Sequence, residues 1–180
     1  MSRAAPRAPT PLDPAEIARL AEKYRRLAAL RRGRTRGEPI PERAVFRELA
    51  GEFPGALYEL DNLPIEGIDG RLAALEQAAA GAPAEPWVAW MLAYHALMRA
   101  ALYVKIRVSR KAALSAGEAA ALAAKASAHA RVEVGEAFVL AVKEPPEGRL
   151  NRVVYPEIAA RLGAPEEEIR RALFPRRGAG

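Results

Sequence analysis

The chain has 180 residues, of which 51% are apolar and only 6% aromatic, and its formal net charge is +6. It contains no cysteine, which excludes disulfides, zinc–thiolate sites, iron–sulfur clusters and cysteine nucleophiles. Much of the apolar content is alanine, the best helix former, so the composition favours a single domain with an all-α fold.

The basic excess is concentrated at the start of the chain. Residues 1–36 hold ten Lys/Arg against three Asp/Glu, whereas residues 37–180 hold 18 against 19. This asymmetry is typical of an arm that contacts nucleic acid, but an arginine-rich, solvated helix face is the simpler interpretation. The candidate nucleic-acid contacts in this region are Arg25, Arg26, Arg31 and Arg32. The N-terminal residues lack the apolar stretch of a signal peptide, so a cytoplasmic location is expected.

The first helix has a clear start signal. Residues 1–12 are rich in proline without apolar periodicity, which predicts a disordered tail. Asp13 is then placed as the N-cap, Pro14 as the first helical residue and Glu16 as the partner in a capping box. We therefore assign 13–36 to a basic N-terminal helix and linker, which projects from the rest of the protein or packs loosely against it.

The segment 37–148 is predicted to form the core of a helical bundle. Apolar periodicity predicts helices over 41–52, 56–62 and 64–80. The next helix, over 86–110, is apolar around most of its circumference, as in the centre of a bundle or in a membrane. Two polar residues near its middle, which would be costly in lipid, favour the bundle. The sequence therefore predicts an all-α, single helical bundle of about five to seven helices around a central helix near 86–110.

The region after the central helix is predicted to be one long helix. Ser115 and Glu118 have the spacing of a capping box, and the helix is expected to run from there to about Lys143. Alternation of apolar residues around Val132 leaves a short strand within 131–142 as the alternative. The breaker Glu-Pro-Pro-Glu-Gly at 144–148 ends this part of the chain.

The C-terminal segment 154–173 resembles a helix-turn-helix. It has a small residue, Ala159, where the two helices would touch, a turn glycine, Gly163, and an aliphatic residue, Ile169, facing back to the first helix. We interpret 149–180 as a helical hairpin that docks on the bundle or on a protein partner.

A DNA-reading role for this hairpin stays open as an alternative. The second helix would begin with the glutamates at 166–168, which phosphate repels and which suit an exposed helix N-terminus. Arg170 and Arg171 follow directly and are the candidate nucleic-acid contacts of this segment.

Four polar residues form a candidate cluster. His95 and Arg99 lie one turn apart on the central helix, and His129 and Glu133 have the same spacing further on. If the two helices were antiparallel neighbours, these side chains would approach one another as in the metal or ligand site of a bundle enzyme. The chain has only two histidines, so a structural ion pair or a satisfied core histidine is the simpler interpretation.

Arg99 needs a partner if it is buried, because a buried guanidinium is costly without an acidic group. The candidate carboxylates are Asp61, Asp69 and Glu133. We predict no catalytic residues, no metal ion and no cofactor, since no nucleotide-binding or hydrolase motif occurs in the sequence.

These features favour a non-catalytic interaction or regulatory protein, with a protein partner or self-association and no membrane association. The first alternative is a nucleic-acid-binding protein that uses the basic N-terminal arm together with the segment 154–173. The second alternative is a bundle enzyme or binding protein for a small ligand or metal ion.

Overall fold

The computed structural model describes residues 11–32 and 43–176, and all regular elements in these ranges are helices. They are α1 (Pro14–Arg31), α2 (Arg43–Glu52), α3 (Ala56–Asn62), α4 (Ile65–Ala79), α5 (Pro86–Val108), α6 (Ala116–Ala130), α7 (Glu136–Lys143), the 3₁₀ helix η1 (Pro146–Gly148), α8 (Asn151–Leu162) and α9 (Glu166–Leu173). The predicted all-α bundle is confirmed, with nine α-helices in the described ranges where about five to seven were expected.

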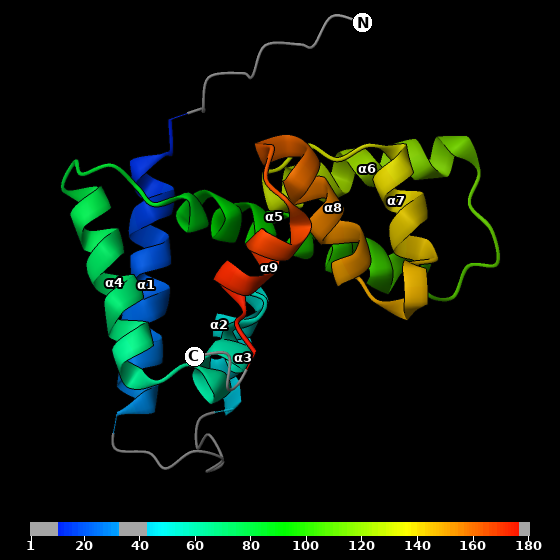
Figure 1. The fold of residues 1–180 in the computed structure, drawn as a ribbon. Helices are drawn as coiled ribbons and strands as arrows, with labels where there is room; N and C mark the ends of the chain where they lie inside the picture. The colour runs from blue at the N-terminus through cyan, green and yellow to red at the C-terminus, as the bar shows by residue number, and fades with distance from the viewer. Residues whose placement is uncertain (1–10, 33–42, 177–180) are drawn as a thin grey trace, which may run out of the picture.

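Helix α5 is the centre of the bundle, as predicted. It runs across the molecule from the α1–α4 pair to the α6–α7 pair and contacts α1, α2, α6, α7, α8 and α9 (Figure 1). Its start at Pro86 is favourable, because the first N–H of a helix has no partner within the helix. Met91, Leu97 and Val104 are fully buried, so α5 contributes side chains to the core along most of its length. None of the described helices combines the length and apolar character that crossing a membrane requires.

Helix α1 belongs to the bundle and does not project from it. It starts as predicted, with the Asp13 carboxylate accepting a hydrogen bond of 2.9 Å from the N–H of Ala15. It then packs antiparallel to α4 (Figure 1), and Leu20, Tyr24 and Leu27 are fully buried. The predicted loose packing is therefore wrong, because an apolar stripe faces α4. The predicted tail up to residue 10 and the linker 33–36 lie outside the described residues.

The single long helix predicted over 115–143 is wrong. The capping box of Ser115 and Glu118 starts α6 as expected, but α6 ends at Ala130, and the next residue, Arg131, has a left-handed φ of +56°. The Ser127 hydroxyl stabilises the break, because it accepts a hydrogen bond of 2.9 Å from the N–H of Val134. The chain then turns into α7, so no strand forms within 131–142, and the apolar alternation there belongs to the short link between the two helices.

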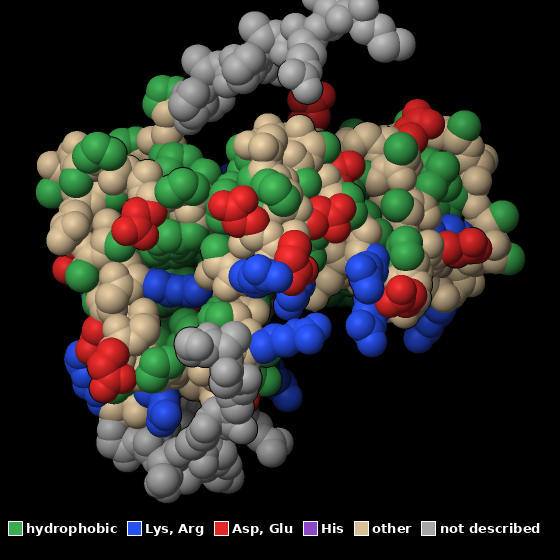
Figure 2. Space-filling view, in the orientation of Figure 1, with side chains coloured by type: hydrophobic (Ala, Val, Ile, Leu, Met, Phe, Trp, Pro, Cys, Tyr) green, Lys and Arg blue, Asp and Glu red, His purple; other side chains and the backbone are tan. Residues whose placement is uncertain are grey.

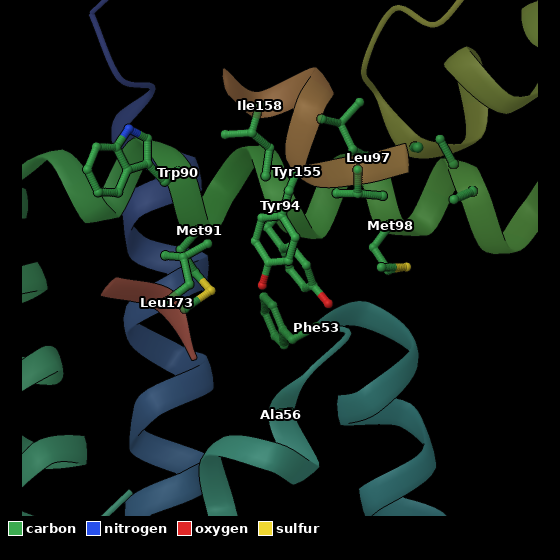
Figure 3. Packing of buried hydrophobic residues seen from close by; sticks show 14 of the residues in the cluster. Phe53, Ala56, Trp90, Met91, Tyr94, Leu97, Met98, Tyr155, Ile158 and Leu173 are labelled. Atoms are coloured by element: carbon green, nitrogen blue, oxygen red, sulfur yellow. The ribbon is translucent and has the colours of Figure 1, made fainter. Parts of the chain in front are cut away.

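The C-terminal hairpin has the predicted helical form and docks on α5. Gly163, with φ +70°, ends α8, and Ile169 on α9 is fully buried. In the core beneath the hairpin, the rings of Tyr94 and Tyr155 lie beside each other with their centroids 5.7 Å apart (Figure 3), and the Phe174 ring lies 4.8 Å from that of Tyr94. The hairpin thus closes one side of the aromatic core around the middle of α5.

Candidate functional site

The four residues of the predicted polar cluster lie in different surroundings. His95 is only 2% exposed, whereas His129 is exposed and lies against the Tyr103 ring at 4.7 Å between centroids. Glu133 is also exposed, and its main-chain carbonyl, not its carboxylate, accepts a hydrogen bond of 2.6 Å from Arg161. The structure therefore does not bring the four side chains together. Across the described ranges, no group of three His, Asp or Glu side chains is placed to hold a metal ion.

Arg99 finds partners that the sequence did not suggest. Its guanidinium is half-buried and donates to the main-chain carbonyls of Glu52, at 3.0 Å, and Ala130, at 3.4 Å. These carbonyls end α2 and α6, where the helix dipole is negative, so a cation is stabilised there. We expected the carboxylate of Asp61, Asp69 or Glu133 as the partner of Arg99. The structure shows the C-terminal ends of two helices in that role instead.

The structure brings together a different set of charged side chains. Five polar side chains from four helices meet in the interior, and we call them the buried charged cluster. They are Lys23 and Tyr24 from α1, Glu59 from α3, Arg71 from α4 and His95 from α5. The side chain of Lys23 is 0% exposed and that of Glu59 1% exposed. A charged pair so completely removed from water is unusual, because desolvation is costly.

Glu59 is the centre of the buried charged cluster. One carboxylate oxygen forms an ion pair with the Lys23 ammonium, and the other accepts hydrogen bonds from the Tyr24 hydroxyl, at 2.5 Å, and from Arg71, at 2.6 Å. The second terminal nitrogen of Arg71 donates to the carbonyls of Ala172, at 2.8 Å, and Leu173, at 3.0 Å. The cluster therefore connects α1, α3, α4 and α5 with the end of α9.

The buried charged cluster holds two cations and only one carboxylate. Burial lowers the pKa of Lys23 to about 8, against the attraction of Glu59. Burial, together with the nearby charges of Lys23 and Arg99, also lowers the pKa of His95 well below its ordinary value, so this histidine is neutral at pH 7. Its Nε2 lies 3.1 Å from the Lys23 ammonium and accepts a hydrogen bond from it.

The second ring nitrogen of His95, Nδ1, has no hydrogen-bond partner among the described residues. With Nε2 as acceptor, the ring proton is on Nδ1, which is buried and makes no hydrogen bond. The rings of Phe53 and Tyr94 surround the imidazole edge-on, at 5.2 and 6.2 Å between centroids. Lys23, Glu59 and His95 are closed off from solvent, and their contacts brace the helices that they join.

The sequence contained a signal for the buried charged cluster. Lys23 is three residues after Leu20 and four before Leu27, both of which are fully buried. Glu59 has the same relation to the buried residues Ala56 and Leu63. A charged residue at helical spacing within an apolar stripe faces the core, and this pattern would have identified both partners.

An open groove lies at the N-terminal end of α5. It has a volume of about 1070 Å³ and is bounded by the start of α1, the end of α4, the first turns of α5 and the end of α8. In Figure 2, hydrophobic side chains lie in the upper part of the recess between the α1–α4 pair and the α8–α9 hairpin, and a Lys or Arg side chain lies lower in it. The apolar floor of the groove includes Ile17, Ala78, Ala89, Trp90, Leu92 and Ala93.

The rim of this groove is mainly acidic. Asp13, Glu16 and Glu85 lie along it, and Arg161 is the cation among those lining residues that belong to the described ranges 11–32 and 43–176. The Glu85 carboxylate accepts a hydrogen bond of 2.7 Å from the indole N–H of Trp87. We call the whole surface the acid-rimmed groove, and it joins an apolar floor to a negative edge.

The candidate nucleic-acid contacts on α1 mostly face acidic partners. Arg25 forms ion pairs with Glu22, at 3.2 Å, and Glu76, at 3.5 Å, and Arg32 forms one with Asp69, at 3.0 Å. The two remaining candidates, Arg26 and Arg31, are half-buried, and the former lies 3.9 Å from Glu22. These carboxylates reduce the positive field that phosphate would meet.

The candidates on α9 also share a carboxylate. Glu167 pairs with Arg170, at 2.5 Å, and with Arg171, at 3.1 Å, and these hydrogen bonds lower the pKa of Glu167 to about 2. On the face shown in Figure 2, Lys and Arg side chains gather in a band across the middle and lower part, with some Asp and Glu beside it. Glu167 therefore reduces the positive field of Arg170 and Arg171.

Comparisons with known protein families, with curated proteins and with solved structures found no match. The functional argument therefore depends on the geometry alone.

Proposed function

We propose that the protein is a non-catalytic interaction protein that binds a basic, amphipathic helical segment of a partner protein in the acid-rimmed groove. The observation that carries this proposal is the combination, in one open groove of about 1070 Å³, of an apolar floor and a rim with three carboxylates.

The shape and lining of the groove favour a helix over a small molecule. Sites for small molecules are enclosed and place a few convergent polar groups around the ligand. The floor here offers alanine methyl groups at Ala78, Ala89 and Ala93, which allow a backbone to approach closely, and Trp90 as a larger apolar contact. An amphipathic helix that lays its apolar face into a hydrophobic groove has the matching form.

The charge of the rim selects the partner. Asp13, Glu16 and Glu85 outnumber Arg161, so Lys or Arg beside the apolar face of the incoming helix would be attracted to the rim. Charges at the rim of an interface are screened by salt and act mainly on the association rate and on specificity.

A non-catalytic role agrees with the chemistry of the interior. Burial lowers the pKa values of Lys23 and His95 in the buried charged cluster, and both residues are 2% exposed or less. A reaction centre needs access to a substrate, and these two side chains are closed off from solvent.

Two designed helical peptides with the same apolar face test the proposal, one flanked by arginine and the other by glutamate. Fluorescence anisotropy should show binding of the arginine peptide with a dissociation constant on the order of 10 µM, and at least tenfold weaker binding of the glutamate peptide. Ala93→Arg places a charge on the groove floor and should abolish binding. Ala124→Arg adds the same charge to the exposed face of α6 and should not.

The charge of the rim is tested by the double variant Asp13→Asn/Glu85→Gln, which keeps the capping and hydrogen-bonding ability of both side chains. It should weaken the arginine peptide several-fold at low salt and reduce the salt dependence. Equal binding of the two peptides, or binding that is unaffected by Ala93→Arg, would refute the proposed function.

A further inference from the structure

The C-terminal end of α5 carries an exposed apolar ridge. Leu102 is 39% exposed and Ile106 is 75% exposed, although the opposite face of the same helix buries Val104 and Val108. The two exposed residues are four apart and therefore lie on one face, and the half-buried Tyr103 lies beside them. No described element covers Leu102 and Ile106, whereas the Tyr103 ring packs against His129 of α6.

The apolar ridge is surrounded by cations. The Arg107 guanidinium lies over the Tyr103 ring, 3.4 Å from its centroid, and donates a hydrogen bond of 2.9 Å to the Tyr103 carbonyl. Lys105 and Arg110 flank the same turns, and neither forms an ion pair in the part of the chain that the structure describes. There is no Asp or Glu between Pro86 and Gly117. We call Leu102, Tyr103, Ile106, Arg107 and Arg110 the basic ridge.

The basic ridge has the chemistry that the acid-rimmed groove requires. It is a helical surface with aliphatic and aromatic side chains at the centre and arginines at the edge. The groove offers small residues and Trp90 at the centre and carboxylates at the edge. Tyr, Trp and Arg are the residue types that contribute most to the energy of protein interfaces, and all three occur at this pair of surfaces.

The two surfaces lie at opposite ends of one helix, so they do not compete within a molecule. The groove uses α5 from Pro86 to Ala93, and the ridge is centred near Ile106. At 1.5 Å per residue, they are separated by roughly 25 Å along the helix axis. Figure 1 shows α5 extending from the α1–α4 pair to the α6–α7 pair, which places the two surfaces at opposite sides of the protein.

We propose that the basic ridge of one molecule docks in the acid-rimmed groove of a second copy of the chain, which makes the protein a head-to-tail assembly. This inference rests on the proposed function, because it uses the same groove and names the partner. A contact between two different surfaces is heterologous, so after pairing one molecule keeps a free groove and the other keeps a free ridge. Repetition of the contact produces a ring or an open filament.

Analytical ultracentrifugation of the full chain over a wide concentration range tests this proposal. The wild-type protein should form dimers and larger species as concentration rises, and fewer of them at high salt. Ile106→Glu disables the ridge and Ala93→Arg disables the groove, so each variant alone should remain monomeric. Leu140→Glu changes another aliphatic residue, 50% exposed on α7, and should associate like the wild type.

Mixing the two disabled variants gives the decisive result. One intact ridge and one intact groove remain in an equimolar mixture, so it should form a dimer and no larger species. A wild type that stays monomeric, or variants whose mixture forms no dimer, would overturn the head-to-tail contact. Thermal unfolding of each variant identifies any loss that is due to misfolding.

Binding of the arginine peptide separates this proposal from the proposed function. The Ile106→Glu variant retains its groove and should bind the peptide as the wild type does. If the protein is monomeric but binds the peptide, the self-association fails while the groove function holds. If the peptide does not bind, the proposed function fails as well.

Discussion

Replacing Lys23 by methionine should stabilise the protein at neutral pH, although the change deletes an ion pair. The Lys23 ammonium is fully buried, and the carboxylate of Glu59 that it faces is shared with Tyr24 and Arg71. Methionine has a similar length and places a thioether next to Met91, which already lies 3.8 Å from the Lys23 ammonium. The variant therefore keeps the packing and removes one of two cations.

The size of the effect follows from the lowered pKa of Lys23. A decrease from 10.5 to about 8 means that holding the charged form in the folded protein costs about 3 kcal/mol of unfolding free energy. The expected gain for Lys23→Met at pH 7 is therefore between about 1 and 3 kcal/mol.

The pH dependence gives an independent check. The pKa of Lys23 is lower in the folded state than in the unfolded state, so the unfolded chain binds more protons between about pH 8 and pH 10.5. The wild-type protein should therefore gain stability relative to Lys23→Met as the pH rises, by about 2 kcal/mol from pH 8 to pH 10. The difference between the two proteins cancels the contribution of the tyrosines.

Urea unfolding followed by far-UV circular dichroism measures both the stability gained at pH 7 and its change with pH. Lys125→Met, which changes an exposed lysine on α6, is the control and should leave the stability within about 0.5 kcal/mol. Glu59→Gln should instead destabilise by about 3 to 5 kcal/mol, because it leaves two buried cations without a carboxylate. A loss of more than about 1 kcal/mol in Lys23→Met would refute the reasoning, since the attraction to Glu59 would then outweigh desolvation.

Two further predictions concern the turn before α3 and the hairpin. Gly55 has φ +93°, and a Cβ there would lie 2.7 Å from the Phe174 ring, so Gly55→Ala should destabilise the protein by more than about 1 kcal/mol. The control is Gly51→Ala, which has open space around the new methyl group and should be neutral or stabilising. Thermal unfolding measures both effects. In a mobility-shift assay with duplex DNA at low salt, Arg170→Ala/Arg171→Ala should give the same result as the wild type, because both arginines are paired with Glu167. Weaker binding by the variant than by the wild type would restore the DNA-reading interpretation.

The parts of the fold that depend on local signals were predictable. Asp13 starts α1, Ser115 starts α6 and Gly163 ends α8, since each of these residues is favoured by its position in a helix. The central position of α5 followed from its apolar circumference. The break after α6 was not predictable in the same way, because it depends on a left-handed Arg131, a conformation that non-glycine residues adopt rarely.

The candidate site was less predictable because it depends on contacts between distant residues. His95 was correctly seen as polar within a buried helix, but its partner is Lys23, 72 residues away. Arg99 was expected to find a carboxylate and instead binds two helix ends. Sequence spacing identifies which residues share a face of a helix, but only the packing of helices decides which faces meet.

The link between Arg71 and α9 also affects the order in which the protein is completed during synthesis. Glu59 and Arg71 are 12 residues apart and leave the ribosome almost together, but the carbonyls of Ala172 and Leu173 follow 101 and 102 residues later. At about 5 to 20 residues per second, that interval lasts roughly 5 to 20 seconds. During this interval, one terminal nitrogen of Arg71 can bind Glu59, while the second terminal nitrogen can donate only to water. The last helix therefore removes this arginine from water, and the growing chain reaches its full stability only when α9 has been made.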